Sequence, residues 1–229
     1  MNKSNGFNII LLFWIVATIQ LVSILLDYKT GIRLSKPLLI PVLMLPVIFN
    51  TSVHATRKKM MILALLFSWA GDIFLMLPGN GYFIPGLIGF LFAHISYILY
   101  FYCIKDPSAP LPKQSPIIFA AILGFAAILL FILFPHLGEL KIPVLLYTLV
   151  ICCMLLAAIY ISPFTRQGAG RFFIMGALFF VCSDSLLAFN KFYQPFSGAA
   201  FSIMLTYCIA QFLIVKAYMI NDIRSKLIT

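Results

Sequence analysis

Charged side chains are scarce in this sequence, and acidic ones are the scarcest. Only 10% of the 229 residues are charged, and only six are Asp or Glu. Hydrophobic residues make up 63% of the chain, and the mean hydropathy of +1.08 lies far above that of soluble domains of this size. The composition therefore excludes a soluble globular domain and predicts an all-α, polytopic membrane protein.

Several motifs that mark common enzyme chemistries are also missing. The sequence has no Gly-rich phosphate loop, no Ser hydrolase elbow, no metalloprotease motif and no Cys-x-x-Cys spacing. The five cysteines fall within or at the ends of apolar runs, which is typical of small buried hydrophobic residues. Only one histidine lies inside an apolar run, so a zinc hydrolase is disfavoured, although a site of one His and two Asp stays open.

Eight apolar runs approach or reach the length of about 17 to 25 residues that crosses a bilayer. They cover residues 7–26, 36–50, 59–77, 82–104, 115–134, 141–161, 171–190 and 197–220. The second run is the weakest of these, because it is short and contains Pro37, Pro41 and Pro46. The first run has no small-x-small cleavage site after it and is expected to remain as a span. The connections are short, so we expect one eight-helix domain over residues 1–229. With eight spans, both termini lie on the same side of the membrane.

The basic residues indicate which side that is. Ten Lys and Arg fall on the side of the termini and five on the other, which predicts cytoplasmic termini. The net charge of +10 is then topogenic rather than a sign of nucleic-acid binding, and the cluster Arg57-Lys58-Lys59 is interpreted as topogenic and headgroup-binding. The compact length and short termini favour a bacterial inner membrane.

Two carboxylates lie inside apolar runs, Asp72 in the third and Asp184 in the seventh. A carboxylate within a bilayer costs roughly 2.5 to 3.5 kcal/mol on insertion scales, so each needs a partner or a function. At a rise of 1.5 Å per residue, they would lie about 8 and 9 Å from the non-cytoplasmic ends of their helices. The simplest interpretation is a packing hydrogen bond to Ser68, Ser183 or Trp69. Because the two depths match, we favour a shared site in which one carboxyl group is protonated and the other is an anion.

Other polar residues are expected near this pair. His94 is the histidine inside a span, and it is interpreted as a site residue rather than a packing residue. Tyr207 and Gln211 are one helical turn apart and can hydrogen-bond into the same pocket. Lys36, at a membrane boundary, could either extend to the headgroups or bind a lipid phosphate.

The sequence also contains a candidate internal repeat. An offset of 112 residues aligns Leu66, Phe67, Asp72, Leu75 and Gly86 with Leu178, Phe179, Asp184, Leu187 and Gly198. Four spans separate the members of each pair, so the halves would be parallel repeats related by an axis along the membrane normal. This hypothesis places the two aspartates face to face. It would be contradicted by a structure with the third and seventh spans at opposite edges.

Five groups of motif residues occur in order along nearly the whole chain. They are Lys36-Pro37, Ser68-x-x-Gly71-Asp72, Gly86-x-x-x-Phe90-x-x-x-His94-x-x-Tyr97, Gly176-Ala177-x-Phe179-x-x-x-Ser183-Asp184-x-x-Leu187-Ala188, and Tyr207-x-x-Ala210-Gln211-x-Leu213-Ile214. Each motif is weak alone, but the combination is specific. In this combination the chain resembles the YhhN family of eight-span membrane proteins, which includes the lysoplasmalogenases.

The resemblance implies hydrolysis of the vinyl ether bond of lysoplasmalogens in the lipid bilayer. It implies that Asp72 and Asp184 act as acid and base, in roles that the sequence does not assign, and that no metal or organic cofactor is needed. The site residues would be completed by His94, Tyr97, Ser183, Tyr207 and Gln211, which position water or the glycerol, and by Lys36 at the phosphate. The oligomeric state is left open.

A second interpretation from the residues is a proton- or cation-coupled transporter, or a lipid-binding protein, that uses the same aspartates. Discontinuous helices would favour it, and Pro41, Pro46 and Pro85 are where such breaks could occur.

Overall fold

The computed structural model describes residues 3–49, 54–104, 115–166 and 168–222, with the side chains of residues 3–8 and 80 excepted. Over these residues the chain forms eight long α-helices and no strand. They are α1 (Lys3–Leu25), α2 (Lys29–Ile48), α3 (Ala55–Met76), α4 (Phe83–Ile104), α5 (Pro116–Leu133), α6 (Lys141–Ile161), α7 (Ala169–Ala188) and α8 (Ala199–Asp222). Together they follow the eight predicted spans in order.

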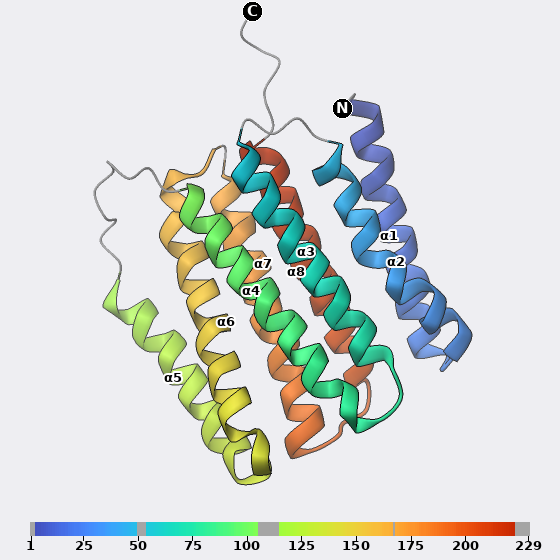
Figure 1. Cartoon of the computed structure of the whole chain (residues 1–229), viewed down its shortest axis with the longest axis vertical. Coiled ribbons are helices and arrows are strands. Elements are labelled where there is room, and N and C mark those ends of the chain that lie inside the picture. Colours follow the sequence, from blue (N-terminus) through green and yellow to red (C-terminus); the bar gives the residue numbers. More distant parts are fainter. Residues whose placement is uncertain (1–2, 50–53, 105–114, 167, 223–229) are drawn as a thin grey trace, which may run out of the picture.

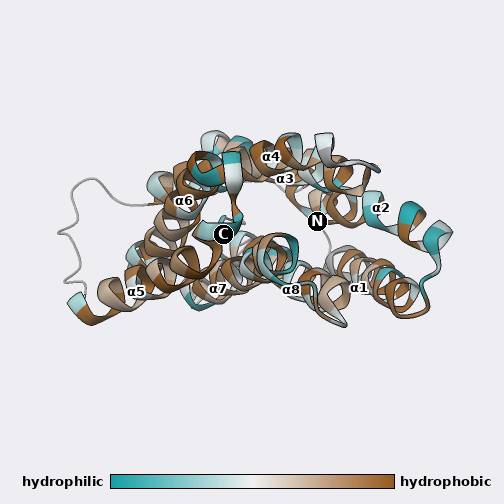
Figure 2. Cartoon of the chain, turned by 90° about the horizontal axis from the view of Figure 1, so that it is seen from below, coloured by the Kyte–Doolittle hydropathy of each residue, from teal (hydrophilic) through white to brown (hydrophobic). Residues whose placement is uncertain are grey.

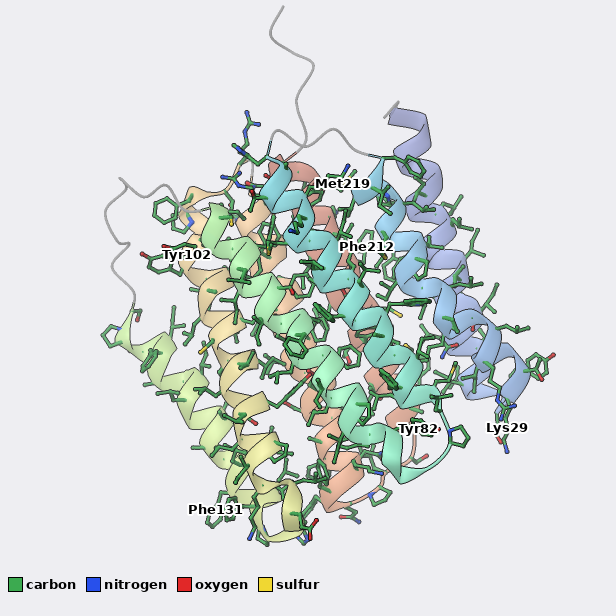
Figure 3. The ribbon with its side chains drawn as sticks, viewed as in Figure 1. Lys29, Tyr82, Tyr102, Phe131, Phe212 and Met219 are labelled. Atoms are coloured by element: carbon green, nitrogen blue, oxygen red, sulfur yellow. The ribbon has the colours of Figure 1, made fainter. Side chains whose placement is uncertain are left out.

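The helices have the length and apolar character of membrane spans. Seven of them are long and apolar enough to cross a bilayer, and the described side chains of α1 add a shorter apolar stretch, Ile9–Leu25. Large hydrophobic side chains face outward, such as Phe131, which is 83% exposed and is labelled at the end of α5 in Figure 3. A surface of this kind is expected where the solvent is lipid. The predicted polytopic helical fold is confirmed.

The helices lie in two layers (Figure 2). One layer holds α2, α3, α4 and α6, the other holds α1, α8 and α7, and α5 lies at the periphery beside α6 and α7. Helix α1 begins and α8 ends at the same end of the bundle (Figure 1). We call the opposite end, which carries the connection between α3 and α4, the far end. At that connection Gly79 has a φ of +108°, which a residue without a side chain adopts readily.

Glycines allow a close contact between α3 and α4. A Cβ atom on Gly89 would lie 2.9 Å from the Cα atom of Gly71, and a Cβ on Gly71 would lie 2.7 Å from the ring of Phe90. Within a membrane, helices associate through such close packing of small residues, because burial from lipid supplies no hydrophobic driving force. This contact fixes α3, and with it Asp72, against α4.

Helix α2 differs from its predicted bounds, because it begins at Lys29 rather than at residue 36. Its first turns are too polar to extend an apolar run. They are stabilised instead by a buried hydrogen bond in which Ser35 Oγ donates to Gln20 Oε1 of α1 at 2.6 Å. The prediction from hydropathy alone was therefore short by about two turns.

The prolines of α2 do not break it, since the helix runs continuously through Pro37, Pro41 and Pro46. Pro41 has no N–H to give to the carbonyl of Pro37, four residues earlier. The indole Nε1–H of Trp69 on α3 donates to that carbonyl at 2.8 Å. A neighbouring helix thus satisfies the backbone group that the proline leaves unpaired. Helix α4 likewise continues past Pro85, so the broken helices that would favour a transporter are not found at these prolines.

The end of the bundle where α1 begins and α8 ends holds a partly buried ion pair that the sequence interpretation missed. Arg57 Nη1 lies 3.0 Å from Asp222 Oδ1, and the Tyr100 hydroxyl donates to Asp222 Oδ2 at 2.5 Å. Arg57 Nε also donates to the carbonyl of Cys103 at 3.0 Å. The cluster Arg57-Lys58-Lys59 was interpreted as topogenic and headgroup-binding, and the structure adds that the guanidinium of Arg57 joins α3 to α4 and α8.

The glycine contact leads to a test of the packing. Replacement of Gly89 by Leu should force α3 and α4 apart and destabilise the protein by about 1 to 3 kcal/mol or more, because the obstacle is backbone that cannot turn aside. Thermal unfolding in detergent measures the effect. Gly124→Leu in α5 is the matched control, since a Cβ there meets nothing within 4 Å. Equal stability of the two variants would contradict the role of the glycine contact.

Candidate functional site

Asp72 is held by residues from two other helices. Its side chain is 3% exposed, the Tyr207 hydroxyl of α8 donates to Oδ2 at 2.5 Å, and Lys36 Nζ of α2 lies 3.7 Å from Oδ1. Within the described part of the chain its partners are these two residues and not Ser68, Ser183 or Trp69, which the packing interpretation had named. Lys36 points to this carboxylate, and its ammonium group compensates the buried negative charge.

The network around Asp72 extends toward the middle of the bundle. The amide of Gln211 donates through Nε2 to the Tyr207 hydroxyl at 3.4 Å, and it accepts a hydrogen bond from the Tyr97 hydroxyl at 2.6 Å. All three side chains are buried. Tyr207 and Gln211, which were expected to hydrogen-bond into one pocket, belong to one hydrogen-bonded cluster, and Tyr97 joins them from α4. We call Lys36, Asp72, Tyr97, Tyr207 and Gln211 the Asp72 cluster.

Asp184 has a different set of partners. The Tyr147 hydroxyl of α6 donates to Asp184 Oδ2 at 2.5 Å. His94 Nε2 of α4 lies 3.2 Å from the same oxygen and 3.0 Å from the Tyr147 hydroxyl, while His94 Nδ1 faces Met154 Sδ at 3.2 Å. His94 is fully buried, and the side chain of Asp184 is 13% exposed. We call His94, Tyr147 and Asp184 the Asp184 cluster.

The sequence interpretation expected the two carboxylates to share one site. In the structure they lie in two separate hydrogen-bonded clusters. The ring of Phe180 lies between the clusters, with its centroid 4.7 Å from that of His94 and 5.6 Å from that of Tyr207. The hydrogen bonds given above for the two carboxylates run within each cluster, and Phe180 lies between them.

The two clusters are related by the proposed repeat. Lys36 and Tyr147 are 111 residues apart, the two aspartates 112, and His94 and Tyr207 113. Each aspartate thus contacts the preceding helix of its own half and the last helix of the other half. Helices α3 and α7 lie inside opposite layers rather than at opposite edges (Figure 2). These relations support the repeat, which stays a hypothesis.

A narrow apolar cleft lies beside Asp184, between α4, α5, α6 and α7. Its empty space, open mouth included, is about 730 Å³. Asp184 and Tyr147 form part of its wall, together with Phe90 and a majority of aliphatic and aromatic side chains. Asp72 does not line it. Of the two carboxylates, Asp184 is therefore the one that a molecule in this cleft would meet.

Ser183 and the residues considered for a zinc site do not come together at one site. Ser183 Oγ donates to the carbonyl of Ile203 at 3.0 Å and so packs α7 against α8. In the part of the chain that the structure describes, Ser183 makes no hydrogen bond to either cluster that would support its predicted role in substrate binding. The set of one His and two Asp that stayed open for zinc is divided between the clusters, and the described residues include no group of three or more His, Cys, Asp or Glu suited to a metal.

Tyr147 is the functional candidate that the sequence interpretation missed. A tyrosine inside an apolar run is not distinguished by composition from one that faces lipid, such as Tyr102, which is 75% exposed. The available signal was the repeat, because an offset of 111 residues from Lys36 leads to Tyr147.

Comparison with known proteins finds relatives named lysoplasmalogenase. A human protein, lysoplasmalogenase TMEM86A, is 32% identical over 169 residues, which are 70% of this chain and 65% of the relative. The lysoplasmalogenase of Mycobacterium tuberculosis is 29% identical over 165 residues, 71% of this chain and 61% of the relative. Human lysoplasmalogenase TMEM86B is 32% identical over 151 residues, 66% of this chain and 59% of the relative.

The matched region thus spans somewhat less than two thirds of the length of these relatives. No solved structure matches the chain. The model of the YhhN family matches residues 32–218, a range that contains Lys36, both aspartates, His94 and Tyr147. This chain belongs to the YhhN family.

Proposed function

We propose that this protein is a membrane hydrolase that cleaves the vinyl ether bond of lysoplasmalogens, releasing a fatty aldehyde and a glycerophospho-ethanolamine or glycerophosphocholine. The observation that carries the proposal is Asp184, a carboxyl group in the wall of an apolar cleft within the membrane, hydrogen-bonded by Tyr147 and beside His94. The family and the names of the relatives support the substrate class. The eight helices would act together as one domain.

The chemistry needs one proton donor and one water molecule. A carboxylic acid transfers its proton to the β-carbon of the vinyl ether, and the adjacent carbon becomes an oxocarbenium ion. Water adds to that carbon and loses a proton back to the carboxylate, which gives a hemiacetal. The hemiacetal then collapses to the aldehyde and the glycerol hydroxyl. Glycosidases divide acid and base work between carboxyl groups in a similar way.

We assign the donor role to Asp184. Its hydrogen-bonding partners Tyr147 and His94 both contact Oδ2, and Asp184 lines the cleft, so in this proposal Oδ1 carries the proton. The hydroxyl of Tyr147 and the ring of His94 hold the carboxyl group in place and lie where water could be bound.

Asp72 would act from a distance. Lys36 compensates its charge as an anion, and Phe180 lies between it and the Asp184 cluster. A fixed negative charge near the oxocarbenium ion stabilises that ion without touching it. In this proposal Lys36 serves Asp72 and not the lipid phosphate.

Replacement of either aspartate by Asn tests the division of roles. We expect membranes containing the wild-type protein to release aldehyde from a lysoplasmalogen and none from its saturated alkyl ether analogue. Asp184→Asn should lower the rate by about 10²- to 10⁴-fold, because it removes the proton donor. Asp72→Asn should lower it by a smaller factor. Aldehyde release is measured at equal protein level, and its absence with the wild-type protein would refute the proposed activity.

The tyrosines provide a matched pair across the two clusters. Tyr147→Phe removes the hydrogen bond that orients Asp184, and we expect a loss of roughly tenfold or more in kcat. Tyr207→Phe removes the equivalent bond to Asp72 and should cost less activity. Thermal unfolding of both variants separates this effect from stability. A larger loss with Tyr207→Phe would transfer the donor role to Asp72.

We also propose that both termini face the cytoplasm of a bacterial cell, on the basis of the basic residues. Alkaline phosphatase fused after Gly79, at the far end, should then be active, whereas the same enzyme fused to the C-terminus should be inactive. A fluorescent protein that folds only in the cytoplasm gives the converse control. The opposite pattern would place the far end in the cytoplasm.

A further inference from the structure

We propose that the cleft beneath α5 is a lateral binding site for one single-chain lipid, whose hydrocarbon chain enters from the bilayer between α5 and α7 and whose phosphate lies at the far end beside Lys191. This inference deepens the proposed function and rests on it for the identity of the lipid. It concerns where the substrate binds and how it arrives, which the carboxylate clusters alone do not determine.

The wall of the cleft is suited to a hydrocarbon chain with one reactive point. Besides the carboxyl group of Asp184 and the hydroxyl of Tyr147, the wall contains the hydroxyls of Thr148 and Ser185. Each of these two donates to a carbonyl of its own helix, Thr148 to Val144 at 2.8 Å and Ser185 to Val181 at 2.7 Å. Their hydrogen bonds are already made, so they present little polarity to a ligand. Among the residues that line the cleft, Asp184 is the one that carries a carboxyl group, and most of the others are apolar.

Helix α5, which covers the cleft, is loosely attached. Within it only Ala126 and Leu133 are buried. The C-terminal end of α5, at the far end of the bundle, is held by a small apolar cluster of Leu133, Leu137 and Val144. Helix α5 is therefore attached more firmly there than at its N-terminal end. The rest of α5 exposes large side chains to lipid. An element with so few buried contacts can separate from its neighbours at low cost.

A second apolar groove continues the cleft toward the lipid. It lies between α5, α6 and α7 and has an empty space of about 1140 Å³, open mouth included. The two share the side chains of Phe125, Leu129, Cys152, Val181 and Ser185. The cavity beside Asp184 therefore leads to the membrane under α5, a route by which a lipid chain can reach Asp184 without leaving hydrocarbon.

The far end of the cleft is marked by a cation. Phe83 and Phe192 line the cleft there with their ring centroids 5.5 Å apart, and Lys191 Nζ lies 5.3 Å from the centroid of Phe83. Lys191 follows Asp184 by seven residues, or about 10 Å along a helix. The glycerol backbone separates the vinyl ether of a lysoplasmalogen from its phosphate and can span such a distance. Charge and spacing thus favour a lysophospholipid, oriented with its phosphate at this end.

Photolabelling tests the site without relying on hydrolysis. The probe is a lysophosphatidylcholine analogue with a saturated alkyl ether chain, which acid cannot cleave as it does a vinyl ether, and a diazirine in that chain. We expect labelled peptides from α5 and α7 that include Leu129 or Val181. An excess of the alkyl ether lysolipid without diazirine should reduce labelling at least tenfold. Labelling spread over the outward faces of all helices, and insensitive to competitor, would overturn the site.

Two pairs of adjacent residues supply the variants. Cys152 is buried and lines the cleft, whereas Cys153 is exposed. Ala126 is buried in the cleft, and Ala127 beside it is not. Cys152→Trp or Ala126→Phe should fill the cleft and reduce competed labelling at least tenfold. Cys153→Trp and Ala127→Phe should leave it unchanged. Labelling at the wild-type level in both cleft-filling variants would contradict the inference. If Cys152→Trp does not fold, the comparison of Ala126→Phe with Ala127→Phe provides the test.

Lys191 is tested by competition. Lys191→Ala should raise the concentration of alkyl ether lysolipid that halves the labelling by about tenfold, as expected for loss of a phosphate contact. Lys29→Ala, a cation in α2 away from the cleft, should leave that concentration unchanged. An unchanged value for Lys191→Ala would refute the phosphate position. Because the probe is not a substrate for hydrolysis, labelling without aldehyde release from a lysoplasmalogen would sink the proposed activity and leave the lipid site standing.

Discussion

Burying a carboxylate in a membrane requires a partner that compensates its charge or its hydrogen bonds, and this requirement determines the interior of the protein. Each of the buried aspartates is satisfied by residues from other helices. Asp72 has Lys36 and Tyr207, Asp184 has Tyr147 and His94, and Asp222 has Arg57 and Tyr100. Because an unpaired carboxylate in lipid is costly, these contacts also fix which faces of the helices turn inward.

The two aspartates of the candidate site are equivalent in position and different in chemistry. Matching helices supply their partners, yet one half provides an ammonium group where the other provides a phenol. The ammonium group of Lys36 faces Asp72, whereas Asp184 meets the hydroxyl of Tyr147 and the ring of His94. In the mechanism proposed above, this symmetric frame with unlike partners supplies an acid and an anion from two copies of one residue.

The packing of the bundle is equally uneven. Helices α3 and α4 approach until the backbones of Gly71 and Gly89 nearly touch, and α7 meets α8 closely at Gly176. Helix α5, in contrast, buries only Ala126 and Leu133. The clusters are thus held by the tightly packed part of the molecule, while the cleft lies under the loosest helix. In the proposed mechanism, such an arrangement would hold the two carboxylate clusters in place and leave the approach to Asp184 deformable.

The sequence by itself determined the membrane class, the eight spans and the need to explain Asp72 and Asp184, because hydropathy and the cost of buried charge are properties of local composition. It also grouped Tyr207 with Gln211, which are one turn apart on the same helix. It did not find Tyr147, the partner of Arg57 or the true start of α2. Only the tertiary structure decided which polar groups meet. It also placed Phe180 between the two aspartates and put Asp184, but not Asp72, in the wall of the cleft. Those contacts join residues up to 165 positions apart, and they depend on how each helix is rotated about its axis, which is set by the packing of all the others.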